Sequence, residues 1–97
     1  MSLKKTIIIK SFIVNNGELI ITDQKNNEYY LITKDGTVNT IIRNKDKEEV
    51  GINYLEENDI IEIYGYELKS NKFIIKKIYI ETKYKFNSES SDDSDIY

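Results

Sequence analysis

Short runs of β-branched and aromatic residues alternate with polar segments along most of this chain. Five such runs cover residues 6–14, 18–23, 28–33, 60–66 and 73–82. Each run has the length and composition of a β-strand, and Asn15-Asn16-Gly17 between the first two is typical of a tight hairpin turn. No stretch of ordinary helix length places its apolar residues at helical spacing. The pattern therefore predicts an all-β domain.

The segment between the third and fourth runs is less regular. Residues 38–42 either extend the sheet or form a short connection. Val50, Ile52 and Leu55 are spaced for a short strand or for one helical turn, and the pattern leaves both open.

Five or six short strands in so short a chain must hide their edges, which predicts a small closed β-barrel. Alternation along each strand then predicts which side chains face the core. In the fourth run, Ile61, Ile63 and Gly65 share the inner face, and Tyr64 and Tyr66 point outward. The glycine would allow the neighbouring strand to approach closely.

The other runs are assigned by the same rule. In the first run, alternation predicts that Ile7, Ile9, Ser11 and Ile13 point inward. It predicts that Ile8, Lys10 and Phe12 point outward. In the last run the more apolar face is placed toward the core, with Ile74, Ile78 and Ile80 inside and Phe73, Lys77 and Tyr79 outside. One ring of the pair Tyr29 and Tyr30 must point outward, and alternation does not decide which.

The C-terminal segment has a different composition. From Asn87 onward the chain consists almost entirely of Ser, Asp and Glu, which cannot bury enough apolar area to fold. We therefore predict two parts: a barrel domain over residues 1–87 and a disordered acidic tail over residues 88–97.

The absence of Cys and His excludes several kinds of chemistry. It removes disulfides, thiolate nucleophiles, the commonest general base and the usual zinc ligands. We expect no enzymatic activity and no cofactor, although a site made of carboxylates alone is possible in principle. The tail acids do not predict a metal site, because a disordered segment offers no preformed geometry.

The N-terminus resembles no signal peptide and no apolar run could span a membrane, so we expect an intracellular protein, cytoplasmic or nuclear.

Charge is distributed unevenly along the chain. There are 14 Lys and Arg residues against 17 Asp and Glu, a net charge of −3. Residues 69–85 hold six lysines with Glu81 as their one acid, whereas residues 88–97 hold four acids and no base. A basic segment therefore precedes an acidic tail. An A/T-rich genome would also enrich lysine and tyrosine, so composition alone does not establish a binding surface.

The pattern resembles the OB-fold of nucleic-acid-binding proteins in three places. Ser11 stands where the family has a small residue at the bend of its first strand, and residues 19–23 match an apolar-x-apolar-x-Asp step. Residues 55–65 match a leucine, Gly-Asp, alternating-apolar, Gly sequence, with Asn58 in place of the first glycine. Asn tolerates the left-handed backbone that the glycine would adopt. The Asp35-Gly36 turn would be a better fit to the competing fold, an SH3-like or other small barrel.

The resemblance implies a ligand groove between the turns at 15–17 and 69–72. Single-strand binding combines cations for phosphates with rings on which bases stack. The candidate residues are Lys10, Phe12, Tyr30, Tyr64, Tyr66, Lys69, Lys72, Phe73 and Lys77. The leading hypothesis is therefore non-enzymatic binding of single-stranded nucleic acid, with DNA favoured. Sheet-packing rings and a solvated lysine face are the structural alternatives for these residues.

The tail resembles the acidic tip of single-stranded-DNA-binding proteins, which in that family contacts partner proteins. Its candidate partner-binding residues are Asp92, Asp93, Asp95, Ile96 and Tyr97. A solubilising tail is the simpler interpretation. The rival hypothesis for the whole chain is an OB-fold adaptor subunit, supported by Ile8, Ile60 and Ile75 at positions that alternation places outside.

Overall fold

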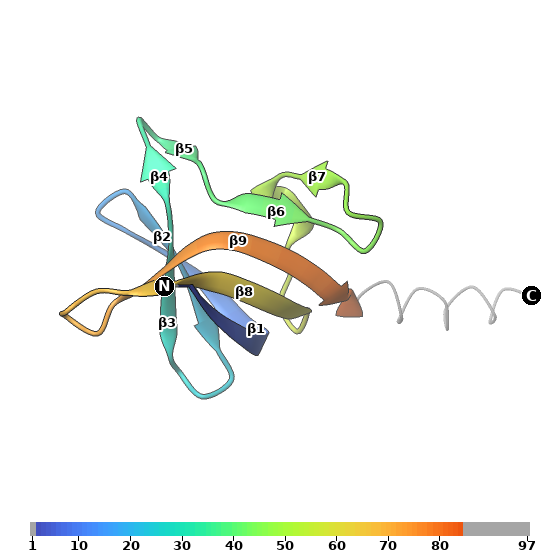
Figure 1. Ribbon diagram of the computed structural model, residues 1–97, viewed down its shortest axis with the longest axis horizontal. Helices are drawn as coiled ribbons and strands as arrows, with labels where there is room; N and C mark the ends of the chain where they lie inside the picture. Colours follow the sequence, from blue (N-terminus) through green and yellow to red (C-terminus); the bar gives the residue numbers. More distant parts are fainter. Residues whose placement is uncertain (1, 85–97) are drawn as a thin grey trace, which may run out of the picture.

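The chain folds into short β-strands wrapped around one core (Figure 1). The structure, a computed structural model, describes residues 2–84, so the predicted tail at 88–97 lies outside the described residues. The strands are β1 (Leu3–Asn15), β2 (Glu18–Asp23), β3 (Glu28–Leu31), β4 (Thr33–Lys34), β5 (Thr37–Val38), β6 (Ile41–Arg43), β7 (Glu49–Val50), β8 (Ile60–Glu67) and β9 (Phe73–Thr82), with a 3-10 helix, η1 (Ile52–Tyr54), before β8. The prediction of an all-β domain is confirmed.

Five of these strands close into an OB-like barrel. The long strand β1 is shared: its first half pairs with β8 and its second half with β2. β2 continues to β3, β3 lies parallel to β9, and β9 pairs with β8, so the order around the barrel is β1-β2-β3-β9-β8 and back to β1. The Asp35-Gly36 turn forms as predicted, but it closes the separate β4–β5 hairpin outside this barrel.

Two predicted turn positions adopt the backbone that their residue types favour. Asn16 and Gly17 have φ of 54° and 80°, which matches the twist of the β1–β2 hairpin. Asn58 has φ of 72°, so it takes the left-handed conformation expected of a residue that replaces glycine.

A bulge in β1 overturns part of the predicted facing. Ile9 pairs with Asp23 but Ser11 pairs with Thr22, so Lys10 is an extra residue. Alternation changes phase there. Phe12 consequently packs against the core, and Ile13 is 39% exposed, which reverses the predicted positions of both side chains.

A bulge in β9 overturns part of the facing predicted for the last strand. Tyr64 pairs with Lys77 and Gly65 with Ile75, so Lys76 is the extra residue of β9. Ile78, Ile80 and Tyr79 keep their predicted faces, but before the bulge the phase is inverted: Phe73 and Ile75 are buried in the core and Ile74 is on the outer face. The outward placement of Phe73 was therefore wrong, as was that of Ile75.

The irregular middle segment completes the barrel wall and closes one end. β6 takes over from β3 as the parallel neighbour of β9. At the junction the buried Thr40 hydroxyl accepts from the Ile32 N–H (2.8 Å) and donates to the Ile75 carbonyl (2.7 Å). Both open alternatives for residues 50–55 occur: a strand at Glu49–Val50, then the 3-10 turn, with Leu55 buried in the core.

Candidate functional site

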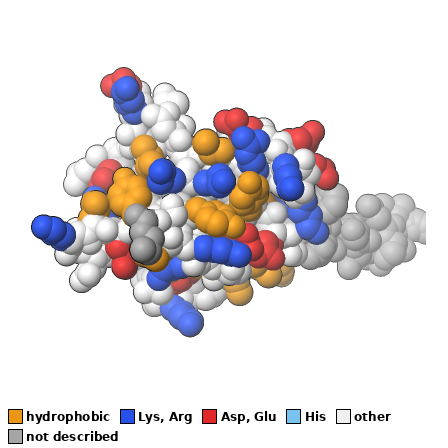
Figure 2. Space-filling view, in the orientation of Figure 1, with side chains coloured by type: hydrophobic (Ala, Val, Ile, Leu, Met, Phe, Trp, Pro, Cys, Tyr) orange, Lys and Arg blue, Asp and Glu red, His pale blue; other side chains and the backbone are white. Residues whose placement is uncertain are grey.

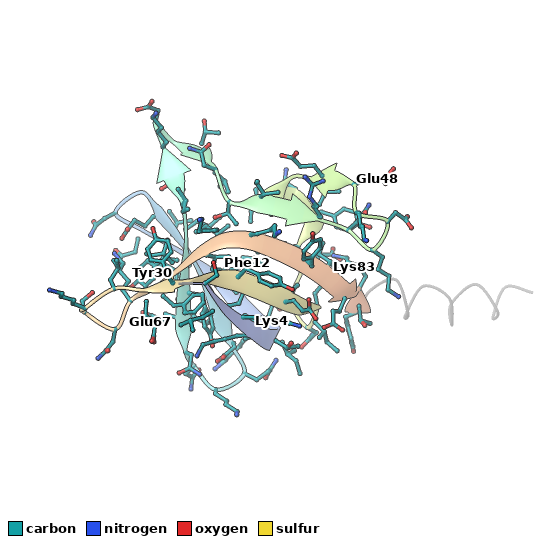
Figure 3. The ribbon with its side chains drawn as sticks, viewed as in Figure 1. Lys4, Phe12, Tyr30, Glu48, Glu67 and Lys83 are labelled. Carbon is teal, nitrogen blue, oxygen red and sulfur yellow. The ribbon has the colours of Figure 1, made fainter. Side chains whose placement is uncertain are left out.

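One row of outward side chains crosses the five strands of the barrel. From β1 through β2, β3 and β9 to β8, the residues in register are Ile13, Ile20, Tyr30, Ile74 and Tyr66. Figure 3 shows Tyr30 beside the crossing of β3 and β9, with Lys83 at the opposite end of β9. The neighbouring register on β8 and β9 adds Tyr64 and, two residues after Lys77, Tyr79. We call the residues Tyr30, Tyr64, Tyr66, Ile74 and Tyr79 the tyrosine strip.

Lys72, in the β8–β9 turn, contacts Tyr30 at one end of the strip. Its ammonium lies 4.3 Å from the centroid of the Tyr30 ring and 3.2 Å from an oxygen of Glu18. Glu18 precedes Ile20 by two residues, and Tyr30 faces Ile20 from β3. Ile20 is 3% exposed although it is on the outer face.

A second lysine lies among the rings of β8 and β9. The Lys77 ammonium is 5.5 Å from the Tyr64 centroid and 5.1 Å from the Tyr79 centroid, and the two rings meet edge to face at 5.9 Å. Arg43 of β6 pairs with Tyr79 in the sheet. Figure 2 shows basic side chains interleaved with hydrophobic side chains on this face. The arrangement offers flat rings and cations within a few ångströms of each other.

Two acidic residues border the strip, Glu62 next to Tyr64 on β8 and Glu81 beyond Tyr79 on β9. Glu62 accepts a hydrogen bond from the Tyr64 hydroxyl (3.1 Å) and lies 3.5 Å from the Lys4 ammonium. The hydrogen bond shared with Glu81, and then those from Tyr64 and Lys4, hold the pKa of Glu62 below its usual value, whereas the same bond raises the pKa of Glu81. Burial and the bond to Glu62 raise the pKa of the Tyr64 phenol.

One end of the strip, at Tyr30, borders a hollow in the surface. It has a volume of about 610 Å³ and lies between the β2–β3 and β8–β9 turns. Tyr30 and Lys72 line it, together with the polar side chains of Asn26, Asn27 and Asn71. The resemblance implied a groove bordered by the turns at 15–17 and 69–72, whereas this hollow is bordered by the β2–β3 turn.

The structure brings together five of the nine candidate residues. Tyr30, Tyr64, Tyr66, Lys72 and Lys77 lie in or on the strip, and Tyr30 is the outward ring of its pair, since Tyr29 is buried. Lys69 is exposed in the adjoining β8–β9 turn.

Three candidates lie elsewhere. The Lys10 ammonium donates to the Asn26 side chain (2.7 Å) in the β2–β3 turn. Phe12 packs on the core, where it lines an apolar hollow with Leu19 and Leu55. Phe73 is 3% exposed and meets the Tyr29 ring edge to face at 5.5 Å. The five tail candidates, from Asp92 to Tyr97, lie outside the described residues.

Two strip residues were missing from the candidate set. Tyr79 could have been included, because alternation already placed it on the outer face with Lys77. Ile74 could not, because only the bulge at Lys76 turns it outward.

Asp23 has a structural role, as expected of an acid at a turn. Its carboxylate accepts hydrogen bonds from the Tyr29 hydroxyl (2.7 Å) and from the backbone N–H groups of Lys25 and Asn27 (2.9 Å each). Burial alone would raise the pKa of Asp23, but these hydrogen bonds outweigh it and hold the pKa below its usual value. Burial and the bond to Asp23 in turn raise the pKa of Tyr29.

The lowered pKa of Asp23 predicts an acid-sensitive contribution to stability. A carboxyl whose pKa is lower in the folded state stabilises the fold above its unfolded pKa, and this is lost as the pH falls through the folded value. We expect wild type to exceed Asp23→Asn in free energy of unfolding at pH 6, and the gap to narrow as the pH falls below about 4. Urea unfolding across this range measures the gap, and a gap that does not change with pH would contradict the assignment.

Among residues 2–84, no group of three or more acidic side chains could hold a metal ion, and no helix is long and apolar enough to cross a membrane. No protein-family model matches the chain, and no curated protein or solved structure matches it either.

Proposed function

We propose that this protein binds single-stranded nucleic acid along the tyrosine strip, without catalysing a reaction. The observation that carries the proposal is that three of the four strip tyrosines have a lysine ammonium within 6 Å of the ring centroid on one outer face. Rings supply stacking platforms that tolerate any base, and the adjacent ammonium groups can neutralise the phosphates. An OB-like barrel supports binding of this kind on its outer face.

The contacts within the strip suggest how a ligand would be received. In the free protein Lys72 rests over the Tyr30 ring and bonds to Glu18. A base that stacks on Tyr30 takes the position of that ammonium, which can then swing toward a phosphate. The amide side chains lining the adjoining hollow offer donors and acceptors to an unpaired base.

Binding of oligo(dT), measured by fluorescence anisotropy over a range of salt concentrations, tests the proposal. For single strands, each neutralised phosphate contributes about −0.7 to the log–log slope. Engagement of Lys69, Lys72 and Lys77 predicts a slope of about −2. Tyr30→Ala should weaken binding by about 1–3 kcal/mol, or roughly five- to 150-fold.

Tyr84→Ala is the matched control, because Tyr84 is an exposed tyrosine (52%) outside the strip. It should bind as the wild type does. A flat salt response, no binding at low salt, or equal losses in the Tyr30 and Tyr84 variants would reject the proposal.

The adaptor hypothesis remains the second candidate. Ile8 is 41% exposed, which favours the adaptor hypothesis, but Ile75 is buried in the core and cannot contribute to an apolar docking face.

We keep the acidic tail as the proposed contact for partner proteins. Deletion of residues 88–97 would remove that contact without altering the strip.

A further inference from the structure

The first half of β1 has a neighbour on one side only. Residues 3–8 pair with β8, and pairing with β2 starts at Ile9, because β2 ends at Asp23. Beyond that point the chain turns away through residues 24–27. The space between forms a groove of about 370 Å³, lined on one side by Lys5–Ile8 and on the other by the β2–β3 turn and Tyr29.

The backbone groups that face this groove follow from the pairing on the other side. The Ile9 N–H donates to the Asp59 carbonyl (3.0 Å), and the Ile9 carbonyl accepts from Asn58 (2.7 Å). Both the N–H and the C=O of Ile9 therefore point toward β8. The pairing of β1 with β8 then continues without a break, with Ile8 opposite Ile60 and Ile7 opposite Ile61. In an antiparallel ladder successive residues alternate, so the N–H and C=O groups of Thr6 and Lys4 point toward the open side.

The chemistry around the open edge is basic and partly apolar. Lys5 and Lys25 line the groove, while Leu3 and Ile8 are 37% and 41% exposed. The acid that also lines it, Asp23, is 5% exposed and its carboxylate already holds the turn together. Lysines along an edge discourage pairing with a second copy. They would attract an extended segment of opposite charge.

We propose that the open edge of β1 is a docking site for an extended acidic segment of a partner protein, which adds a strand beside residues 3–8. Backbone hydrogen bonds to Thr6 and Lys4 would give the affinity, and Lys5 and Lys25 would select acidic side chains. A second copy of this chain is disfavoured, because two-fold pairing would bring Lys4, Lys5 and Lys25 of both copies together. The groove shares Lys5, Asn27 and Tyr29 with the hollow beside Tyr30 but contains no residue of the tyrosine strip, so the proposal goes beyond nucleic-acid binding.

A synthetic nonapeptide that alternates valine with aspartate and glutamate is the probe. We expect saturable binding by fluorescence anisotropy, together with slowed hydrogen exchange of the Thr6 amide. The same peptide N-methylated at every amide keeps its charge but has no donors, and should bind at least tenfold more weakly. A peptide with lysine at each acidic position should also bind at least tenfold more weakly.

Thr6→Pro tests the edge in the protein itself. The Thr6 N–H points to the open side, so proline removes a donor for the added strand without removing a bond to β8. We expect Thr6→Pro to lower peptide affinity at least tenfold while Thr6→Val, which keeps the N–H, binds as wild type does. An unchanged circular dichroism spectrum and an unchanged salt slope for oligo(dT) would show that both variants remain folded.

Several outcomes would overturn the proposal. These are no saturable binding of the acidic peptide, equal binding of the N-methylated or lysine peptide, or equal affinities of the two Thr6 variants. Sedimentation that shows a dimer which Thr6→Pro dissociates would assign the edge to a second copy instead. A failure here would leave oligo(dT) binding unaffected, so the two proposals can fail separately.

Discussion

Replacing Gly65 with alanine is expected to destabilise the barrel severely. Gly65 lies on the side of β8 that faces the barrel core, and it pairs with Ile75 of β9. A Cβ atom there would lie 1.8 Å from the Ile74 carbonyl oxygen and 2.9 Å from its carbon. These are backbone atoms of the adjacent strand, so no side chain can rotate to relieve the clash, and the two strands must separate.

We expect Gly65→Ala to lower the free energy of unfolding by about 3 kcal/mol or more, at or beyond the upper end for overpacked cores. In a domain of this size that corresponds to a fall of about 12 °C or more in the thermal midpoint. Urea unfolding followed by circular dichroism measures the loss. Gly65→Val should fail to fold.

Gly51→Ala is the matched control for this prediction. A Cβ at Gly51 would meet nothing within 4 Å, and its φ of −88° suits any residue. Its stability should stay within about 0.5 kcal/mol of wild type, as for an ordinary surface substitution. Similar stabilities for the two alanine variants would show that β8 and β9 tolerate a wider spacing.

Loss of the Asp59 carboxylate is expected to have the second large effect. Asp59 is completely buried before β8, and its oxygens accept from the Glu56 N–H (2.8 Å), the Tyr84 N–H (3.0 Å) and the Lys83 ammonium (2.6 Å). The same ammonium donates to the Tyr54 carbonyl and lies 3.4 Å from Glu56. One carboxylate thus joins the end of β9 to the segment that closes the barrel end.

We expect Asp59→Ala to lower the free energy of unfolding by about 3–5 kcal/mol, as for removal of one partner from a buried ion pair. The cost arises because Lys83 loses its buried counter-charge and two backbone donors lose their acceptor. Asp59→Asn keeps the shape but not the charge and should still destabilise clearly.

Asp35→Asn makes the same chemical change at the exposed β4–β5 turn, where Asp35 has φ of 53°. Asn tolerates this conformation as well as Asp, so stability should stay near that of wild type. If the Asp35 and Asp59 variants unfold at the same urea concentration, the buried carboxylate does not anchor β9.

The placement of individual side chains was predictable where alternation is uninterrupted. In β8 the facing of Ile61, Ile63 and Gly65, with Tyr64 and Tyr66 opposite, is confirmed. The predicted facing was wrong for Phe12 and Phe73. In each case a bulge residue in the strand, Lys10 or Lys76, reverses the alternation of inward and outward side chains. Nothing in the local composition marks Lys10 or Lys76 as such a residue.

The sequence by itself determined the five barrel strands, the turns that join them and the all-β class, because strand propensity and the backbone preferences of Asn and Gly are local properties. It also indicated that the barrel must close, since unpaired edges are costly. Only the tertiary structure decided where the bulges fall, how β6 takes over from β3 along β9, and which edge of β1 stays open. These features depend on pairing between segments that are distant in the chain. The tyrosine strip therefore owes its residue types to the sequence and its continuity to the closure of the barrel.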